Sequence, residues 1–264
     1  MRTNDLTRVL ALLTLAVSGV AHAKLHGETV EYKEGTTVLE GYLAYDDAGA
    51  AKKPGIVVVH DWMGVSAETK RRADLLAGLG YVAFAADIYG KGVRPKDMKE
   101  AGAEAGKWKG DRAALRKRAR TALDLLAANK HVDASKLAAI GYCFGGTTAI
   151  ELARSGAPLV GTVSFHGGLD SPTPADGKNI KGKVLALHGG DDPFVPADQV
   201  AAFEKEMRDA NVDWQLVAYG GAVHAFTIPM AGNDNSKGAA YNERADRRSW
   251  EAMKQFFTEI FPTK

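Results

Sequence analysis

The chain has 264 residues, of which 34 are lysine or arginine and 32 are aspartate or glutamate, so its formal net charge is only +2. This balance excludes a strongly basic nucleic-acid-binding protein. The single cysteine excludes an intramolecular disulfide, so a hydrophobic core must stabilise the fold.

The first 23 residues have the pattern of a secretory signal peptide. Arg2 and Arg8 precede an apolar run over residues 9–20, and the triplet "AHA" ending at Ala23 is typical of a cleavage site. The apolar run is shorter than the roughly 20 residues of a membrane span, although an uncleaved anchor is the alternative. We expect cleavage after Ala23 and export, to the periplasm or out of the cell, without stable membrane insertion of residues 24–264.

Strands and helices alternate along these residues. A hairpin is expected over residues 29–33 and 37–45, and the β-branched run 55–60 is typical of a strand covered on both faces. The remaining pattern predicts strands at 81–87, 137–142, 159–165, 183–189 and 213–219, and helices at 67–79, 111–128, 146–154, 197–210 and 239–257. This alternation predicts a single α/β domain over residues 24–264, with a mostly parallel sheet and helices on both faces.

Residues 88–110 interrupt this alternation. The segment has no clear strand and is longer than an ordinary connection, which is typical of a lid or binding loop. Between Ile88 and Arg120 there are 11 lysines and arginines against 4 acidic residues. The excess favours either a basic rim that attracts anionic substrates or a solvated helix face.

The only cysteine lies in a nucleophile-elbow pattern. Residues 141–145, "GYCFG", follow a predicted strand and precede a predicted helix, as the G-x-nucleophile-x-G motif requires. Glycine is expected at both ends because a Cβ there would collide with neighbouring backbone. A helix N-terminus and a nearby imidazolium would favour the thiolate of Cys143, and the N–H of Phe144 would face a developing oxyanion. The alternative is a buried cysteine that only fills space.

In this architecture an acid and then a histidine follow the nucleophile along the chain. The segment "GGDDPFVPAD" after one predicted strand contains Asp191 and Asp192, and "GGAVHAF" after the next contains His224. Both segments lie beyond the carboxyl ends of strands, where open α/β sheets bind ligands. We expect His224 to be the base and one of the two aspartates to orient it.

Other polar residues also follow predicted strands. The loop "HDWMGV" offers the N–H of Trp62 as a second oxyanion donor. Asp61 could control the protonation of the thiol or cap the following helix. His60, His166 and His188 could line the pocket or be satisfied strand-end residues, and no pair of histidines has the spacing of a metal site.

Together these segments resemble the dienelactone hydrolase family of the α/β-hydrolase superfamily. The resemblance covers nearly all of residues 24–264 and rests on "VHDWMGV", "GYVAFAADIYGKG", "GYCFGG" and "HGGDDPFVP" followed by "GAVHAF". It implies the α/β-hydrolase fold. It also implies these roles: Cys143 as nucleophile, His224 as base, Asp192 rather than Asp191 as the orienting acid, and the backbones of Trp62 and Phe144 as oxyanion donors.

Two positions depart from the family pattern. The acidic residue that interacts with the resting thiol is a glutamate in members that cleave dienelactone, whereas the matching residue here is Asp61. Those members also carry an arginine four residues after the catalytic histidine, where this chain has Ile228. The resemblance therefore implies the reaction type more firmly than the namesake substrate.

The predicted function is hydrolysis of small-molecule esters or lactones, of the carboxymethylenebutenolidase type, through an acyl-enzyme on Cys143. No cofactor or metal is expected, and the sequence does not predict an oligomeric state. One alternative is a redox-sensing or binding protein that uses the exposed thiol. Another is an enzyme that acts on thioesters or small amides.

Overall fold

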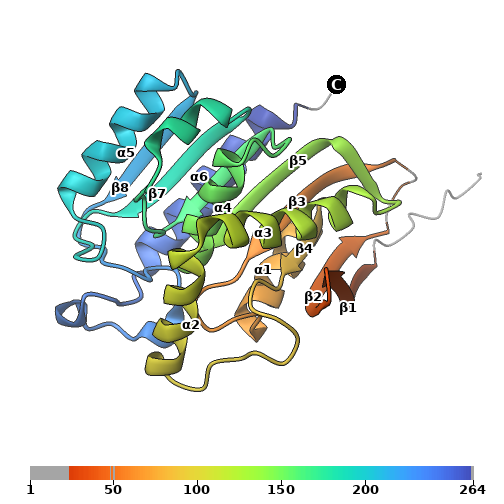
Figure 1. Ribbon diagram of the computed structural model, residues 1–264, viewed down its shortest axis with the longest axis horizontal. Helices are drawn as coiled ribbons and strands as arrows, with labels where there is room; N and C mark the ends of the chain where they lie inside the picture. The colour runs from red at the N-terminus through yellow and green to blue at the C-terminus, as the bar shows by residue number, and fades with distance from the viewer. Residues whose placement is uncertain (1–23, 48, 50, 263–264) are drawn as a thin grey trace, which may run out of the picture.

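The structure is a computed structural model that describes residues 24–47, 49 and 51–262 (Figure 1). The predicted signal peptide, residues 1–23, lies outside the described residues. Within the described part of the chain, no helix is long and apolar enough to cross a membrane.

Eight strands form one sheet in these residues. They are β1 (Leu25–Glu34), β2 (Thr37–Asp46), β3 (Lys53–Val59), β4 (Val82–Ala86), β5 (Val132–Tyr142), β6 (Gly161–Phe165), β7 (Lys183–Gly189) and β8 (Trp214–Tyr219). Their order across the sheet is β1-β2-β4-β3-β5-β6-β7-β8. The pairs β1·β2 and β2·β4 are antiparallel and all others are parallel, which confirms the predicted sheet.

Helices cover both faces of the sheet. They are α1 (Ala67–Gly78), α2 (Met98–Gly110), α3 (Arg112–Ala127), α4 (Phe144–Arg154), α5 (Ala197–Asp209) and α6 (Glu243–Ile260), with the short 3-10 helices η1 (Pro174–Asn179), η2 (Pro229–Ala231) and η3 (Asn235–Lys237). Helices α1 and α6 pack on one face of the sheet, whereas α3, α4 and α5 pack on the other. In Figure 1, α3 and α4 lie in front of the sheet.

Strand β3 shows why the sheet is buried on both sides. Successive side chains of a strand point to opposite faces. Ile56 and Val58 belong to the core beside α1 and α6, while Val57 and Val59 belong to the core beside α3 and α4. All four are fully buried, as the continuous β-branched run predicted.

Helix α2 lies inside the segment 88–110, in which the sequence indicated no element. Its N-cap is Asp97, whose carboxylate accepts a hydrogen bond from the Glu100 N–H at 2.8 Å. Buried residues recur at helical spacing along it, namely Ala101, Ala105 and Trp108. Three of its 13 residues are glycines, at 102, 106 and 110, and because glycine is a poor helix former the amphipathic pattern is hard to see in the sequence.

The cations between Ile88 and Arg120 are mostly compensated. Nine of the 11 basic side chains make an ion pair with a carboxylate of the described residues, and Lys96 and Lys99 make none within that part of the chain. The segment therefore does not present the excess positive charge that a count of residue types suggests, which argues against a basic rim. Lys107 and Lys117 are largely exposed, in keeping with a solvated helix face.

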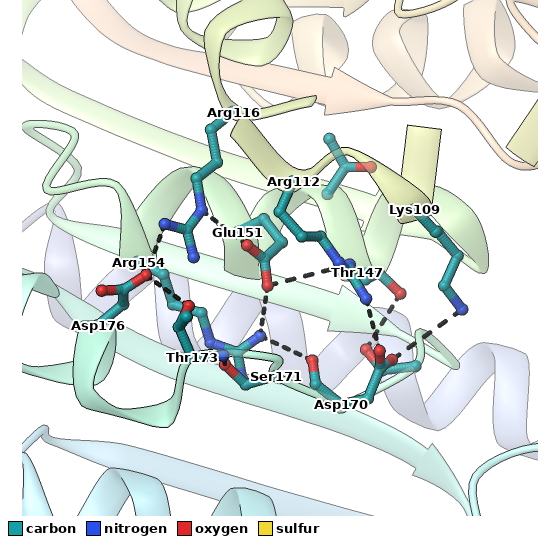
Figure 2. A network of polar contacts seen from close by, with 12 residues as sticks. Lys109, Arg112, Arg116, Thr147, Glu151, Arg154, Asp170, Ser171, Thr173 and Asp176 are labelled. Atoms are coloured by element: carbon teal, nitrogen blue, oxygen red, sulfur yellow. Dashed lines mark hydrogen bonds and ion pairs between the residues drawn. The ribbon is translucent and has the colours of Figure 1, made fainter. Parts of the chain in front are cut away.

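Several of these pairs form one network between α3, α4 and the loop after β6 (Figure 2). Glu151 is fully buried and accepts hydrogen bonds from Arg116 Nε at 2.7 Å and Arg154 Nη1 at 2.8 Å. Arg112 Nη2 donates to Asp170 Oδ2 at 2.5 Å. The network thus anchors the start of α3, and with it the end of the 88–110 segment, to the loop that follows β6.

Candidate active site

Cys143 lies on a strained turn between β5 and α4. Its φ of 55° is in the left-handed region, which residues other than glycine seldom adopt. A Cβ on Gly141 would lie 2.0 Å from the Gly145 carbonyl oxygen, and one on Gly145 would lie 2.3 Å from the Val59 carbonyl oxygen. The predicted steric need for both glycines is therefore confirmed, and the turn lifts the sulfur above the carboxyl ends of the parallel strands.

The structure brings Cys143, His224 and Asp192 into one hydrogen-bonded line. His224, on the loop after β8, places Nε2 3.1 Å from Cys143 Sγ and Nδ1 2.8 Å from Asp192 Oδ2. The second oxygen of Asp192, on the loop after β7, accepts the Phe194 N–H at 2.8 Å. Asp191 instead accepts the Gly221 N–H at 3.1 Å and stays outside this line.

His224 is held in its protonated form by its neighbours. Burial alone would lower its pKa, but the charge of a Cys143 thiolate, the hydrogen bonds to Asp192 and Cys143 and the charge of Asp192 together raise the pKa of His224 to about 10. Both neighbours therefore favour the protonated form of His224.

The two expected oxyanion donors follow the carboxyl ends of β3 and β5. Phe144 is the first residue of α4, so its N–H has no carbonyl partner within the helix. Trp62 lies on the loop after β3, and its carbonyl oxygen accepts a hydrogen bond from the hydroxyl of Tyr89 at 3.1 Å, which ties this loop to Tyr89.

Asp61 shapes the same loop. Its Oδ1 accepts the Met63 N–H at 2.8 Å, and burial raises its pKa. The interpretation of Asp61 as the cap of the next helix is wrong, because Ser66 caps α1 and accepts the Thr69 N–H at 3.3 Å. Ser66 directly precedes the first residue of α1, whereas the Asp61 carboxylate accepts its hydrogen bond from Met63, within its own loop.

Tyr89 borders the site but was not singled out from the sequence, although it lies in the block "GYVAFAADIYGKG". Burial, followed by the charges of Cys143, Glu104 and Asp61, raises its pKa. Its ring lies 5.4 Å from that of Phe144. Only the folded chain brings this tyrosine to the loop of Trp62, so no local signal could identify it.

The three strand-end histidines differ. His60 is fully buried, with Nδ1 bonded to the Asp61 carbonyl and Nε2 accepting the Ile88 N–H at 3.2 Å, and burial lowers its pKa to about 4. His166 is also buried and bonded at both ring nitrogens. His188 is buried with no hydrogen-bond partner for Nδ1 among the described residues. In that part of the chain, no group of three or more His, Cys, Asp or Glu could hold a metal ion.

The model of the dienelactone hydrolase family matches residues 39–261. The chain belongs to this family. Its structure is similar to that of m3DLH, with 45% identity, a TM-score of 0.86 and coverage of 90% of this chain and 99% of that one. It is also similar to P91, titled a dienelactone hydrolase-like promiscuous phosphotriesterase from metagenomic libraries, with 42% identity, a TM-score of 0.84 and coverage of 89% and 98%.

A curated relative has a matching name. The putative carboxymethylenebutenolidase of Saccharolobus solfataricus is 27% identical, over 84% of this chain and 99% of its own. Membership of the dienelactone hydrolase family, together with the sheet order and covering helices, confirms the predicted α/β-hydrolase fold and places the protein in a family of hydrolases.

Proposed function

We propose that this protein hydrolyses esters or lactones of small molecules through an acyl-enzyme on Cys143. The observation that carries the proposal is the line from Cys143 Sγ through the His224 ring to Asp192, in a member of a hydrolase family. A nucleophile, a base within hydrogen-bond reach and a carboxylate that orients the base are the parts that acyl transfer needs.

In the first half-reaction the thiolate of Cys143 attacks the carbonyl carbon. The carbonyl oxygen becomes an oxyanion that the N–H groups of Phe144 and Trp62 would stabilise. The C–O bond to the leaving group then breaks, and the imidazolium of His224 gives its Nε2 proton to the departing alkoxide. A thioester and a neutral His224 remain.

In the second half-reaction water attacks the thioester. His224 Nε2 takes a proton from this water, the same two N–H groups hold the new oxyanion, and the C–S bond breaks to release the acid. The thiolate and the imidazolium return together, so no further proton donor is needed. Asp192 keeps the His224 ring in place during both steps, because its Oδ2 bonds Nδ1 and its Oδ1 is held by the Phe194 backbone.

The surroundings of the sulfur favour an uncharged ester over a carboxylated lactone. Ile228 stands on the loop that carries His224, and the cations of the 88–120 region are largely paired with carboxylates. Because P91 is titled a promiscuous phosphotriesterase, phosphotriesters form a second substrate class to test on this site. Carboxymethylenebutenolides would be the poorer substrates on this reasoning.

The test is release of p-nitrophenol from p-nitrophenyl acetate by residues 24–264, with Cys143→Ala and His224→Ala variants of verified fold. His26→Ala is the matched control, since His26 lies on β1 and pairs with Asp47 rather than with the site. We expect the wild type and the control to turn over and both site variants to lose several orders of magnitude. Equal slow rates in all four proteins would refute hydrolysis of simple esters and favour the redox or binding alternative.

Export is a second part of the proposal, supported by the signal-peptide pattern of residues 1–23. Expression of the full chain in a bacterial host, followed by fractionation and N-terminal sequencing, tests it. A mature chain that begins at Lys24 outside the cytoplasm is expected. An uncleaved chain that stays with the membrane fraction would favour the anchor.

A further inference from the structure

A fully buried histidine, His166, lies between the nucleophile elbow and the loop of the base. It follows β6, and its φ of 40° is in the left-handed region, an uncommon conformation for a residue with a Cβ. Its Nδ1 lies 3.2 Å from the backbone nitrogen of Cys143, and its Nε2 lies 2.8 Å from Oγ1 of Thr227. Both ring nitrogens are thus bonded, each to a different part of the site.

The partners fix the tautomer of this ring. A backbone N–H can only donate, so Nδ1 accepts the hydrogen bond from Cys143 and the ring proton is on Nε2, which donates to Thr227. Burial, followed by the charges of His224 and Arg72, lowers the pKa of His166 well below its usual value. The ring therefore stays neutral beside a protonated His224, and its hydrogen bonds keep one direction.

Thr227 is itself held on the other side. It lies three residues after His224, and its carbonyl oxygen accepts a hydrogen bond from Arg72 Nη2 at 2.8 Å. Arg72 is buried and pairs with Glu68 at 2.8 Å and Asp246 at 3.2 Å. The hydrogen bond from His166 therefore ends at a residue that Arg72 already holds in place. Because Thr227 is held, this bond can fix the position of the His166 ring.

The ring also contacts the base loop by packing. Its centroid lies 5.3 Å from that of His224 and 5.0 Å from that of Phe226, in edge-to-face arrangements. The Cys143 N–H, which donates to His166 Nδ1, also donates to the Phe165 carbonyl at 3.0 Å. The elbow is therefore bonded both to Phe165, the last residue of β6, and to His166, which follows it. The end of β6 is thus the common support of the nucleophile and of the base.

We propose that His166 is a positioning residue of this active site, which fixes the elbow relative to the base loop so that Cys143 Sγ and His224 Nε2 stay in hydrogen-bond contact. The inference rests on the proposed hydrolase function of the site. His166 does not touch the reacting atoms. It acts through the Cys143 backbone at one nitrogen and through Thr227 at the other.

Thr227→Val and His166→Gln test this role. Thr227→Val keeps the shape of the side chain and removes only the acceptor of the Nε2 proton, whereas His166→Gln removes the acceptor of the Cys143 N–H. Thr148→Val is the matched control, because Thr148 is an equally buried threonine whose hydroxyl bonds its own helix, at the Phe144 carbonyl. Melting temperatures verify that each variant is folded.

Two readouts are needed, of which the first does not depend on ester hydrolysis. The rate at which iodoacetamide alkylates Cys143 is measured against pH, since only the thiolate reacts. The midpoint of this profile is expected to move to higher pH in Thr227→Val and His166→Gln, because a looser imidazolium stabilises the thiolate less. With p-nitrophenyl acetate, kcat is expected to fall by about 10- to 100-fold while KM changes by less than about threefold. Thr148→Val should match the wild type in both.

The proposal is overturned if folded Thr227→Val and His166→Gln keep the wild-type alkylation profile, whatever happens to kcat, because the thiolate–imidazolium pair is then undisturbed. Equal shifts in Thr148→Val would also overturn it, since any lost buried hydrogen bond would then suffice. If the wild type fails to hydrolyse any ester, the proposed function fails, but the alkylation profiles still decide the role of His166.

Discussion

Replacing Glu151 with glutamine should destabilise the fold strongly, although the two side chains have nearly the same shape. Glu151 is fully buried and accepts hydrogen bonds from Arg116 and Arg154, and it lies 3.9 Å from Arg112 Nη1. The substitution removes the negative charge that these three guanidinium groups share, and it brings an amide N–H₂ toward groups that can only donate. Removing one partner of a buried ion pair typically costs about 3–5 kcal/mol.

Urea unfolding followed by circular dichroism measures this cost. We expect the free energy of unfolding to fall by about 3–5 kcal/mol, which corresponds to a melting temperature lower by roughly 6–20 °C for a chain of this size. Glu204→Gln is the control, because Glu204 pairs with Arg208 at 2.6 Å on the exposed face of α5 and should contribute about 0–1 kcal/mol. A loss in Glu151→Gln no larger than in Glu204→Gln would refute the reasoning.

Three further predictions concern the site. Asp192→Asn should lower kcat for p-nitrophenyl acetate by about 10³- to 10⁴-fold, whereas Asp191→Asn should stay near the wild type, and steady-state kinetics showing the reverse would exchange their roles. Because the pKa of His224 is raised from 6.5 to about 10, the contribution of its protonated form to stability is fully present below pH 6.5 and is lost as pH rises through about 10. The difference in unfolding free energy between wild type and His224→Gln should therefore shrink across this pH range. A difference that stays constant would contradict this prediction. Gly145→Ala should lower both melting temperature and kcat, because its Cβ would lie 2.3 Å from the Val59 carbonyl oxygen, and a variant equal to wild type in both would show that the turn can relax.

Much of the sheet could be predicted from local sequence because its strands are buried on both faces. The continuous β-branched run of β3 and the short apolar runs of β5 and β7 leave few other structures possible. The first residue of the last helix, α6, could not be predicted as well from the sequence. It begins at Glu243 rather than near residue 239, because Asn242 caps it and Ala239 forms a bridge with His224. Such a bridge depends on tertiary contact.

The candidate site shows the same division. Chain order and motif spacing led to Cys143, to His224 and to the pair Asp191 and Asp192, because these residues lie on loops at the carboxyl ends of strands and parallel strands bring such loops together. Only the family resemblance singled out Asp192 from that pair. The supporting residues could not be predicted in this way. Tyr89 and His166 take their roles from contacts with loops distant in sequence, and a strand-end histidine has no local signature that separates support from catalysis.

The most direct test of the central claim is to look for the acyl group on Cys143. Residues 24–264 are mixed with p-nitrophenyl acetate, quenched in acid during turnover, digested and analysed by mass spectrometry. The proposed mechanism predicts an acetyl group on the peptide that contains Cys143, at a stoichiometry matching the initial burst of p-nitrophenol. Steady release of p-nitrophenol that persists in Cys143→Ala, with no acetyl group on this peptide in the wild type, would contradict it.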